Sequence, residues 1–298
     1  MNKWCWLLLI VLCWSAAGYG IFGVGVKRGN DGISTKKEFE RIVSLAPNIT
    51  EILFALGLGE KVVGVPLYSE YPPETAEKLK VGTFWQPNIE AVIGAKPDLI
   101  VTLEIERQKY IAQRLRRIGY TNLTVDIEKV GDLFDAIKKI GDLTGKQIEA
   151  DKLLSEIKGK LAKISSLGKN EEKLKVLYIV QRKPLRVAGR ETFVNEIIEL
   201  AGGENAIGPT IQKYPPIGSE QVLGSDVDVI IEPSMGQNDL EGLKIKAMEY
   251  WRGFENIPAV KNNRIYVIDD DTVSQLGPRL PEGVEAIARC LRAGSFEN

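Results

Sequence analysis

The sequence predicts an α/β protein of two similar lobes, each built on a mostly parallel sheet, with one long helix between them. Three observations support this fold class. Two segments 130 positions apart share an ungapped pattern, short apolar strands alternate with helical patterns, and one long amphipathic stretch separates two such sets. The repeat indicates that the two halves of the chain have a similar build.

The longer repeat pairs residues 90–101 with residues 220–231. In each copy an acidic residue opens the segment, a glycine follows four positions later, and an aspartate precedes an apolar run. The matched pairs are Glu90 with Glu220, Gly94 with Gly224, and Asp98 with Asp228. A second, shorter match pairs Glu51 with Glu196, each in a short helical pattern stopped by a glycine. The shorter match also arises by chance in α/β proteins, so the prediction of two lobes depends on the longer one.

The first set of elements precedes the long amphipathic stretch. Strands are predicted where apolar residues run together between turn signals, at residues 41–45, 62–65, 99–102 and 123–126. Residues 46–48 predict a turn, after which a helix begins at Thr50 and ends at Gly57. A further helix is predicted at residues 110–118. Strands that alternate with helices in this way favour a parallel sheet.

One long helix is expected at residues 146–167, after a shorter helix that stops near Gly145. Its apolar residues recur at spacings of three and four and form one stripe, which consists of Leu154, Ile157, Leu161 and Ile164. At 1.5 Å per residue this helix spans roughly 33 Å, about the diameter of a small domain, so it can connect two lobes. An ordinary core helix is the alternative.

The second set of elements follows the long helix. Strands are predicted at residues 175–180, 185–188, 228–231 and 264–268, and helices at residues 193–200 and 281–291. This order of elements again indicates an α/β lobe.

Composition excludes several classes of function. The chain has 298 residues, 44% hydrophobic and 27% charged, which is typical of a soluble protein long enough for two domains. Residues 31–298 carry 36 basic and 40 acidic groups, so no nucleic-acid partner is indicated. The absence of histidine excludes a Ser-His-Asp triad, a histidine zinc site and an imidazole ligand to haem or cobalt. Cys290 is the one cysteine beyond the N-terminal apolar stretch, so no internal disulfide is expected. A cluster of Asp, Glu or Tyr could still bind a metal, but no such cluster is visible as a motif, and neither a metal nor a cofactor is expected.

Residues 1–30 are expected to form a signal peptide or an N-terminal membrane anchor. Lys3 precedes an uncharged apolar stretch at residues 4–26, which is long enough to span a bilayer. Ser15 and the two alanines after it suit cleavage by a signal peptidase. Lipidation at Cys13 is a third alternative, which the apolar residues after it disfavour. All three alternatives predict an extracytoplasmic protein, in the periplasm or on the outer face of the cytoplasmic membrane.

Short motifs spread over residues 40–292 carry a family resemblance. They are Arg-Ile-Val-Ser-Leu-Ala-Pro-Asn-Ile-Thr-Glu at 41–51, Tyr-Ser-Glu-Tyr-Pro-Pro-Glu at 68–74, Val-Gly-Thr-Phe-Trp-Gln-Pro-Asn-Ile-Glu at 81–90, Lys-Pro-Asp-Leu-Ile at 96–100, Ala-Gly-Gly-Glu-Asn at 201–205, Ser-Glu-Gln-Val-Leu at 219–223, and Gly-Pro-Arg at 277–279. Each motif alone is weak. In this order and spacing the chain resembles the helical-backbone (class III) periplasmic substrate-binding proteins of ABC importers, of the vitamin B12 and ferric siderophore type.

The resemblance implies two Rossmann-like lobes with central, mostly parallel sheets, at residues 38–145 and 173–294, joined by one rigid helix at residues 146–168. It implies a monomer that holds a small-molecule metal chelate in the cleft between its lobes and delivers it to an ABC permease with its ATPase. It also implies that Glu90 and Glu220 dock on arginines of the permease, which suits an exposed acid in the first turn of a helix. Two ordinary first-turn acids are the alternative.

The resemblance further implies four aromatic ligand contacts, Tyr68, Phe84, Trp85 beside it, and Tyr214. Flat aromatic faces suit a corrin ring or the aromatic arms of a siderophore, although packing in the core or on the surface is the alternative. Three arginines after the first strand of the second lobe suit an anionic siderophore, or else belong to a solvated loop: Arg182, Arg186 and Arg190. Arg279 is expected to be structural and to pair with an acid of the C-terminal lobe.

We therefore expect a binding protein without catalytic activity, whose ligand is a corrinoid such as cobalamin, with a ferric siderophore as runner-up and haem third. An enzyme that processes a chelate or a metal cluster is a different class of function, but it usually needs cysteine or histidine ligands that this chain lacks. A surface adhesion module is a third class, which the ordered motifs oppose.

Overall fold

The structure is a computed structural model that describes residues 38–167 and 172–293. The predicted signal or anchor segment at residues 1–30 lies outside the described residues. All described residues belong to one compact unit. No helix in the described part of the chain is both long enough and apolar enough to cross a bilayer.

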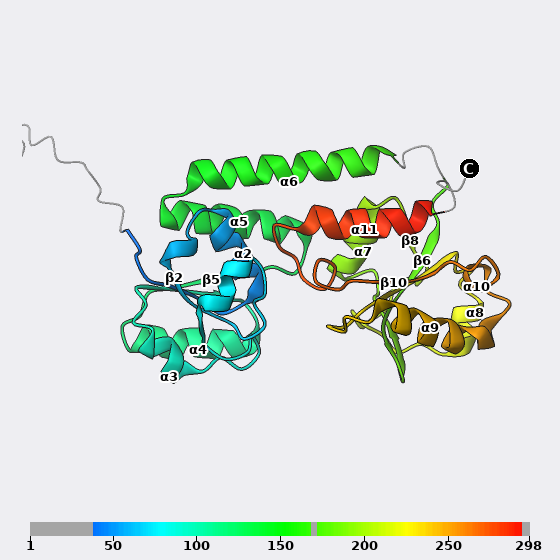
Figure 1. The fold of residues 1–298 in the computed structure, drawn as a ribbon, viewed down its shortest axis with the longest axis horizontal. Helices are drawn as coiled ribbons and strands as arrows, with labels where there is room; N and C mark the ends of the chain where they lie inside the picture. Colours follow the sequence, from blue (N-terminus) through cyan, green and yellow to red (C-terminus); the bar gives the residue numbers. More distant parts are fainter. Residues whose placement is uncertain (1–37, 168–171, 294–298) are drawn as a thin grey trace, which may run out of the picture. The chain divides into compact units, whose positions relative to one another are not determined.

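The N-terminal lobe, coloured blue to green in Figure 1, is built on a five-stranded parallel sheet. The strand order is β3-β2-β1-β4-β5. Its strands are β1 (Ile42–Ser44), β2 (Val62–Val65), β3 (Leu79–Lys80), β4 (Leu99–Leu103) and β5 (Asn122–Val125). Both faces of the central strands are buried, which is why β1 and β4 are apolar runs without alternation. All four predicted strands are present, and the short β3 was not predicted.

Helices cover both faces of this sheet. They are α2 (Pro47–Ala55), α3 (Ile89–Gly94), α4 (Glu106–Arg117) and α5 (Val130–Thr144), with 3₁₀ turns η1 (Gly59–Lys61) and η2 (Pro73–Glu77). The turn predicted at residues 46–48 is wrong, because α2 already begins at Pro47. Proline is well suited to the first position of a helix, where its missing N–H would have no partner.

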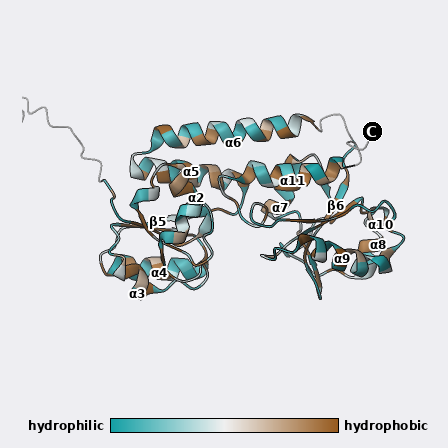
Figure 2. Ribbon diagram, viewed as in Figure 1, coloured by the Kyte–Doolittle hydropathy of each residue, from teal (hydrophilic) through white to brown (hydrophobic). Residues whose placement is uncertain are grey.

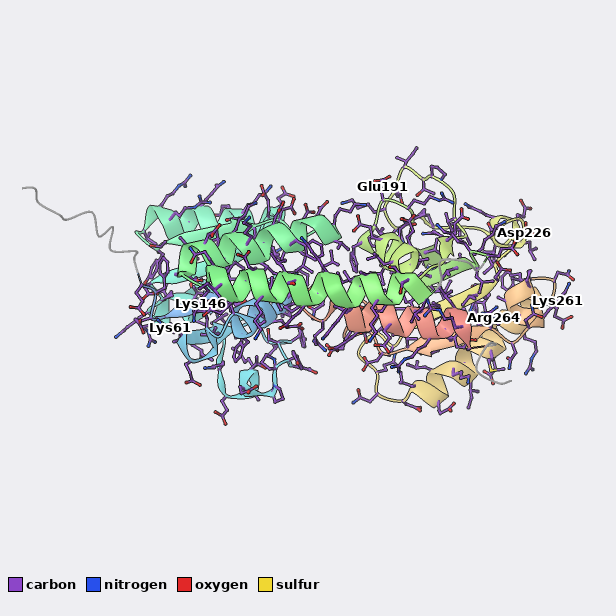
Figure 3. All side chains as sticks on the ribbon, turned by 90° about the horizontal axis from the view of Figure 1, so that it is seen from above. Lys61, Lys146, Glu191, Asp226, Lys261 and Arg264 are labelled. Carbon is purple, nitrogen blue, oxygen red and sulfur yellow. The ribbon has the colours of Figure 1, made fainter. Side chains whose placement is uncertain are left out.

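The predicted connecting helix is α6 (Gln147–Leu167), which is 21 residues long. It packs on α5 of the N-terminal lobe and on α11 and α7 of the C-terminal lobe, and Figure 3 shows it from above along α5 and α11. Its buried side chains include Leu154, Ile157 and Leu161 of the predicted stripe. Hydrophilic residues fill the positions between them (Figure 2). The helix therefore contributes one apolar face to both lobes.

The C-terminal lobe contains a second five-stranded sheet, in the order β10-β9-β6-β7 with β8 paired to β6. Its strands are β6 (Lys175–Arg182), β7 (Leu185–Val187), β8 (Glu204–Asn205), β9 (Val229–Pro233) and β10 (Ile265–Ile268). Among these five described strands, only β7 runs antiparallel, as a hairpin partner of β6. The helices are α7 (Phe193–Leu200), α8 (Ser219–Leu223), α9 (Leu240–Trp251), α10 (Pro258–Lys261) and α11 (Leu280–Arg292), with η3 (Arg252–Phe254). The sheet is mostly parallel, as predicted.

One hydrophobic cluster runs through both lobes. It includes Ile42 and Ile137 of the N-terminal lobe, Leu154 of α6, and Val229 and Ile287 of the C-terminal lobe. Each sheet also buries its opposite face in a smaller cluster of its own. The shared cluster explains why the two lobes form a single compact unit.

The longer sequence repeat is a structural repeat. Each copy is a short helix, α3 or α8, followed by a residue in the left-handed conformation, Lys96 with φ 48° and Asp226 with φ 45°. The aspartate two positions later then accepts hydrogen bonds from the backbone that opens the first strand of its lobe. Asp98 binds the N–H groups of Glu40 and Arg41 at 2.8 and 3.0 Å, and Asp228 binds that of Lys175 at 2.8 Å. The prediction of two lobes of similar build is confirmed.

The shorter match is structural as well. Helices α2 and α7 are each followed by a glycine with positive φ, Gly57 at 73° and Gly202 at 96°. The residue after each glycine donates to the carbonyl five positions earlier, from Leu58 to Leu53 at 2.9 Å and from Gly203 to Ile198 at 3.0 Å. This bond is typical of the Schellman motif, in which glycine adopts the left-handed conformation without strain.

Candidate ligand-binding site

Two loops at the carboxyl edge of the N-terminal sheet carry three of the predicted ligand aromatics. Residues 66–72, here called the Tyr68 loop, follow β2, and residues 82–88, the Trp85 turn, follow β3. Open parallel sheets bind ligands outside the carboxyl ends of their strands. The Leu67 N–H donates to the Gly82 carbonyl at 2.8 Å, which joins the two loops.

The Trp85 turn is tight, and it presents its aromatic pair at the tip. Thr83 and Gln86 exchange backbone hydrogen bonds, both of 3.2 Å, across Phe84 and Trp85. Gly82 has φ 96°, and a Cβ there would lie 2.6 Å from the Asn88 nitrogen. Glycine is therefore required where the chain enters this turn.

The aromatic rings of these loops lie side by side. The ring centroids of Phe84 and Trp85 are 4.8 Å apart with the planes at 75°, and those of Tyr68 and Trp85 are 6.0 Å apart at 32°. Tyr68 is 56% exposed and Trp85 52% exposed. Exposed rings that pack on one another provide an apolar surface of the kind that binds a flat ligand. Sequence reasoning thus selected three residues that the fold brings together.

Gln108 on α4 fixes this edge, and sequence reasoning missed it. Its side chain is fully buried. The amide donates to the carbonyls of Leu45, after β1, at 2.9 Å and of Phe84 at 2.7 Å, and it accepts from the N–H of Leu103, at the end of β4, at 2.7 Å. One amide therefore ties the Trp85 turn to two strand ends. A lone glutamine in a basic helix gives no signal of this role.

Tyr214 lies in the C-terminal lobe, whereas the other three predicted aromatics lie in the N-terminal lobe. It packs against the shared core, and burial raises the pKa of its phenol. Its carbonyl accepts from Arg186 Nη1 at 3.1 Å, and the next carbonyl, of Pro215, accepts from the Val187 N–H at 3.3 Å. These contacts attach the Tyr214 segment to β7. Among the described residues, Tyr214 makes no ring contact with Tyr68, Phe84 or Trp85.

The three arginines of the C-terminal lobe bind groups of their own lobe. Arg182 donates to the buried Glu232 from Nε at 2.8 Å and Nη2 at 2.6 Å. Arg190 binds Glu204 at 2.9 Å, and Arg186 binds the Tyr214 carbonyl. Each guanidinium therefore already has an internal partner, which leaves less donor capacity for an anionic ligand.

A buried ion pair crosses from one lobe to the other. Arg279 Nη2 donates to Glu51 Oε1 at 2.6 Å and Arg279 Nε donates to Oε2 at 3.1 Å, while Gln275 also donates to Glu51 at 3.0 Å. Burial raises the pKa of Glu51, and the arginine opposes that shift. Burial also acts to lower the pKa of Arg279, but its hydrogen bonds to Glu51 and Asp271 outweigh this and raise it. The acid predicted from the C-terminal lobe is Asp271, at 2.6 Å, and Glu51 is a second partner from the other lobe.

The other side of the lobe junction is more open. Glu196 of α7 accepts from the N–H of Val130, the first residue of α5, at 2.7 Å. Lys213 pairs with Glu128 at 2.7 Å, with side chains that are 51% and 60% exposed. Thus both glutamates of the shorter sequence match, Glu51 and Glu196, reach across to the opposite lobe.

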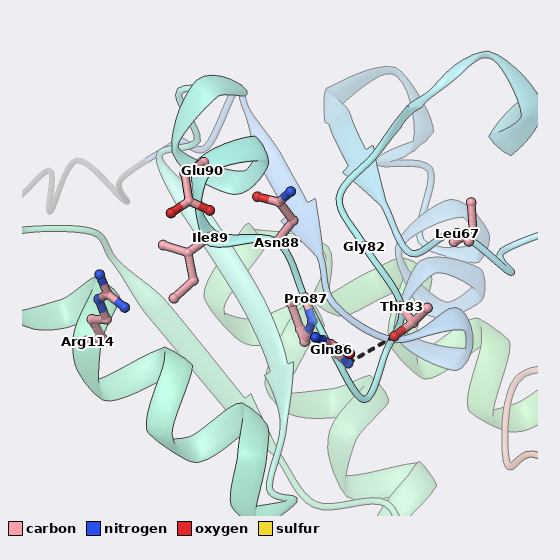
Figure 4. A pocket seen from close by; sticks show the side chains of 9 residues that line it. All are labelled: Leu67, Gly82, Thr83, Gln86, Pro87, Asn88, Ile89, Glu90 and Arg114. Carbon is pink, nitrogen blue, oxygen red and sulfur yellow. Dashed lines mark hydrogen bonds between the residues drawn. The ribbon is translucent and has the colours of Figure 1, made fainter.

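The two acids predicted to dock on a permease are both exposed, in the first turns of α3 and α8. Glu90 also lines an open surface pocket of about 600 Å³, shown in Figure 4. Arg114 of α4 and the apolar side chains of Leu67 and Ile89 share this pocket. None of the four predicted ligand aromatics lines it. Within the described residues, no cluster of three or more acidic, cysteine or histidine side chains is arranged to hold a metal ion.

Comparison with known proteins identifies the family. A family profile described as periplasmic binding protein matches residues 42–272. The chain belongs to the periplasmic binding protein family. An uncharacterized ABC transporter substrate-binding lipoprotein of Bacillus subtilis, YvrC, is 34% identical over 275 residues, which cover 90% of this chain and 85% of that protein.

Two solved periplasmic binding proteins share the fold. A possible iron-binding (periplasmic solute-binding) protein from Staphylococcus epidermidis is 31% identical, with a TM-score of 0.75, over 86% of this chain and 99% of that chain. The periplasmic vitamin B12-binding protein of Vibrio cholerae is 26% identical, with a TM-score of 0.74, over 87% and 99% of the two chains. Because nearly all of each solved chain is matched, the two-lobed body is sufficient for this fold.

Family membership fixes the general role. This periplasmic binding protein is a substrate-binding protein of an ABC transporter, of the type that serves vitamin B12, haem or siderophore uptake. Such proteins act outside the cytoplasm with a permease and its ATPase, and the relatives are binding proteins, not enzymes.

Proposed function

We propose that this protein captures a corrinoid such as cobalamin between its lobes and delivers it to the permease of an ABC importer without catalysing a reaction. The observation that carries the proposal is the cluster of Tyr68, Phe84 and Trp85 at the carboxyl edge of the N-terminal sheet. A corrin ring is broad and flat, so exposed aromatic faces fit it by apolar contact. Tyr214 would contact the ligand from the C-terminal lobe.

The internal partners of the arginines favour a corrinoid over an anionic siderophore. Arg182, Arg186 and Arg190 are bound to Glu232, to the Tyr214 carbonyl and to Glu204. Corrinoids carry mostly neutral amides, which need fewer cationic partners than the charged groups of a siderophore. The relatedness to the vitamin B12-binding protein of Vibrio cholerae supports the same choice.

A ferric siderophore is the second candidate, with haem third. The Staphylococcus relative, described as possibly iron-binding, favours iron. Arg186 also retains donors beyond the one that binds the Tyr214 carbonyl. A siderophore would use the same aromatic cluster for its aromatic arms.

Titration of residues 38–298 with cyanocobalamin, ferric siderophores and haemin tests the ligand assignment. This body contains two tryptophans, the exposed Trp85 and the fully buried Trp251, so a ligand on the cluster changes mainly the Trp85 emission. We expect saturable quenching by cyanocobalamin at micromolar concentration or below. Tight binding of a siderophore alone would replace the first candidate by the second, and failure of all three would remove the assignment.

Substitution of the cluster locates the site. Tyr68→Ala is expected to weaken binding about tenfold, because a stacked aromatic contact contributes roughly 0.5–1.5 kcal/mol beyond its buried area. Tyr110→Ala is the matched control, since Tyr110 is an exposed tyrosine on α4 outside the ring cluster. Equal affinities of the two variants would show that the ligand binds elsewhere.

Glu90 and Glu220 are proposed as the docking contacts for permease arginines. Both are exposed, and the pocket beside Glu90 offers room for a side chain of the partner. Reversal of both charges, Glu90→Lys with Glu220→Lys, is expected to abolish ligand uptake by cells and to leave ligand affinity unchanged. Glu241→Lys is the matched control, because Glu241 is also an exposed first-turn acid, on α9. Uptake that survives the double reversal would disprove docking through these acids.

A further inference from the structure

Arg279 connects three groups from different parts of the chain. It lies just before α11, and its guanidinium binds Glu51 of α2 through two hydrogen bonds and Asp271 through a third. Its flat face covers the ring of Tyr71, with 4.1 Å between the Cζ atom and the ring centroid. One side chain of the C-terminal lobe therefore contacts both a helix and the Tyr68 loop of the N-terminal lobe.

The position of Arg279 is fixed by its acidic partners. The Glu51 residue is 4% exposed and the Arg279 side chain 12% exposed. A desolvated bidentate pair of this kind is costly to break, and the planar fork leaves the guanidinium face free to stack on a ring. Gly277 packs close by, since a Cβ there would lie 3.1 Å from Glu51 Oε2. The guanidinium therefore has little room to shift.

The Tyr71 side chain contacts this guanidinium, whereas the backbone beside it is held by the N-terminal lobe, because the Pro72 carbonyl accepts from the Thr75 N–H at 2.9 Å. The middle of the Tyr68 loop is held by its own lobe, because the Ser69 carbonyl accepts from Thr75 Oγ1 at 2.8 Å. Tyr71 stands at the far end of the loop and is 44% exposed. Its ring has one face on Arg279, at a distance where cation–π attraction is effective.

We propose that Arg279 is a positioning residue for ligand binding, which holds the Tyr71 ring and thereby completes the contacts that keep the Tyr68 loop in its binding conformation. The inference rests on the proposed function, since it takes the Tyr68 loop to be part of the ligand site. The C-terminal lobe thus contributes to the position of an aromatic surface that belongs to the N-terminal lobe. Tyr71 takes part by orienting the loop, not by binding the ligand.

The ligand-free protein tests this without any assumption about the ligand. Acrylamide quenching of residues 38–298 reports on the exposed Trp85, because Trp251 is buried. When the Tyr68 loop moves, the Tyr68 ring leaves Trp85, from which its centroid is 6.0 Å away, and Trp85 becomes easier to quench. We expect increased quenching in Arg279→Lys, which loses the planar face, and in Tyr71→Ala. Tyr71→Phe, which keeps the ring, should match the wild type.

Ligand affinity provides the second measurement. If the loop occupies its binding conformation a tenth of the time in these variants, the apparent Kd rises about tenfold, and Tyr71→Phe restores it. Tyr71→Ala leaves the Glu51–Arg279 pair in place, so it remains informative if Arg279→Lys does not fold. Unchanged Trp85 quenching in Tyr71→Ala would overturn the inference, even if Arg279→Lys binds ligand weakly. Failure of every candidate ligand to bind the wild type would overturn the proposed function alone, because the quenching test needs no ligand.

Discussion

In the N-terminal lobe, Glu51 reaches across to a buried arginine, whereas in the C-terminal lobe the matching Glu196 reaches across to a single backbone N–H. The two glutamates occupy equivalent places, because each lies six residues before the left-handed glycine, Gly57 or Gly202, that follows its helix. Around them the helix ends are alike, down to the same backbone bond after a left-handed glycine. The difference therefore concerns the partner in the opposite lobe and not the helix that carries the acid.

This contrast shows which contacts of the repeated segments are the same in both lobes and which differ. The turns at Asp98 and Asp228 serve their own lobes, and both open a central strand in the same way. The residues that face the other lobe differ, because the two sides of the junction have different surroundings. On the Glu51 side the Glu51–Arg279 pair is buried, although Asp271, the other partner of Arg279, is half exposed, and on the Glu196 side both Lys213 and Glu128 are exposed to water.

The largest expected difference in stability is between alanine variants of the two glutamates. Glu51→Ala should lower the free energy of unfolding by about 3–5 kcal/mol, because it leaves a buried guanidinium without its bidentate partner. Glu196→Ala removes one acceptor of a backbone N–H and should cost about 1 kcal/mol. Urea unfolding of residues 38–298 measures both. Similar losses in the two variants would show that the junction is symmetrical after all.

The sequence predicted the features that depend on the local backbone. Gly57 and Gly202 are required by the left-handed ends of two helices, and Asp98 and Asp228 follow a tight turn, so these positions have a recognisable spacing. Three of the four aromatics came together because they lie in two loops that follow neighbouring strands. The lobes, the parallel sheets and α6 could all be predicted from such patterns.

Contacts between distant segments could not be predicted in this way. Glu51 and Arg279 are 228 positions apart, and Gln108 binds a carbonyl 63 positions away, so no spacing links them. The antiparallel direction of β7 was not predicted, although the two residues between β6 and β7 are too few for the crossover that a parallel pair needs. Helix α9 was missed because its buried residues, Ala247 and Trp251, form no continuous apolar stripe.

A smaller loss of stability is expected from substitutions in the equivalent turns of the two lobes, at Asp98 and Asp228. Asp98 binds two N–H groups with its two carboxylate oxygens, whereas Asp228 binds Lys175 with one. An asparagine at position 98 must point its own NH₂ at one of those donors, so Asp98→Asn should cost roughly 1–3 kcal/mol. Asp228→Asn keeps an oxygen toward Lys175 and should cost less than about 1 kcal/mol. Urea unfolding of the two variants measures the difference, and a larger loss at Asp228 would contradict this account.

The smallest expected effect is the coupling energy between Lys213 and Glu128, the exposed ion pair of the lobe junction. A double-mutant cycle on Lys213 and Glu128 should give a coupling energy below about 1 kcal/mol that disappears in 1 M salt, because both side chains are more than half exposed. The hydrogen bond that Lys213 donates to Glu128 raises the pKa of Lys213, so this contribution is present at neutral pH and is lost as the pH rises through that raised value. The same cycle on Glu51 and Arg279 should give a larger coupling that salt does not remove. If the exposed pair proved as strong and as resistant to salt, the lobes would be held equally on both sides, and the special place given to Arg279 would have no energetic basis.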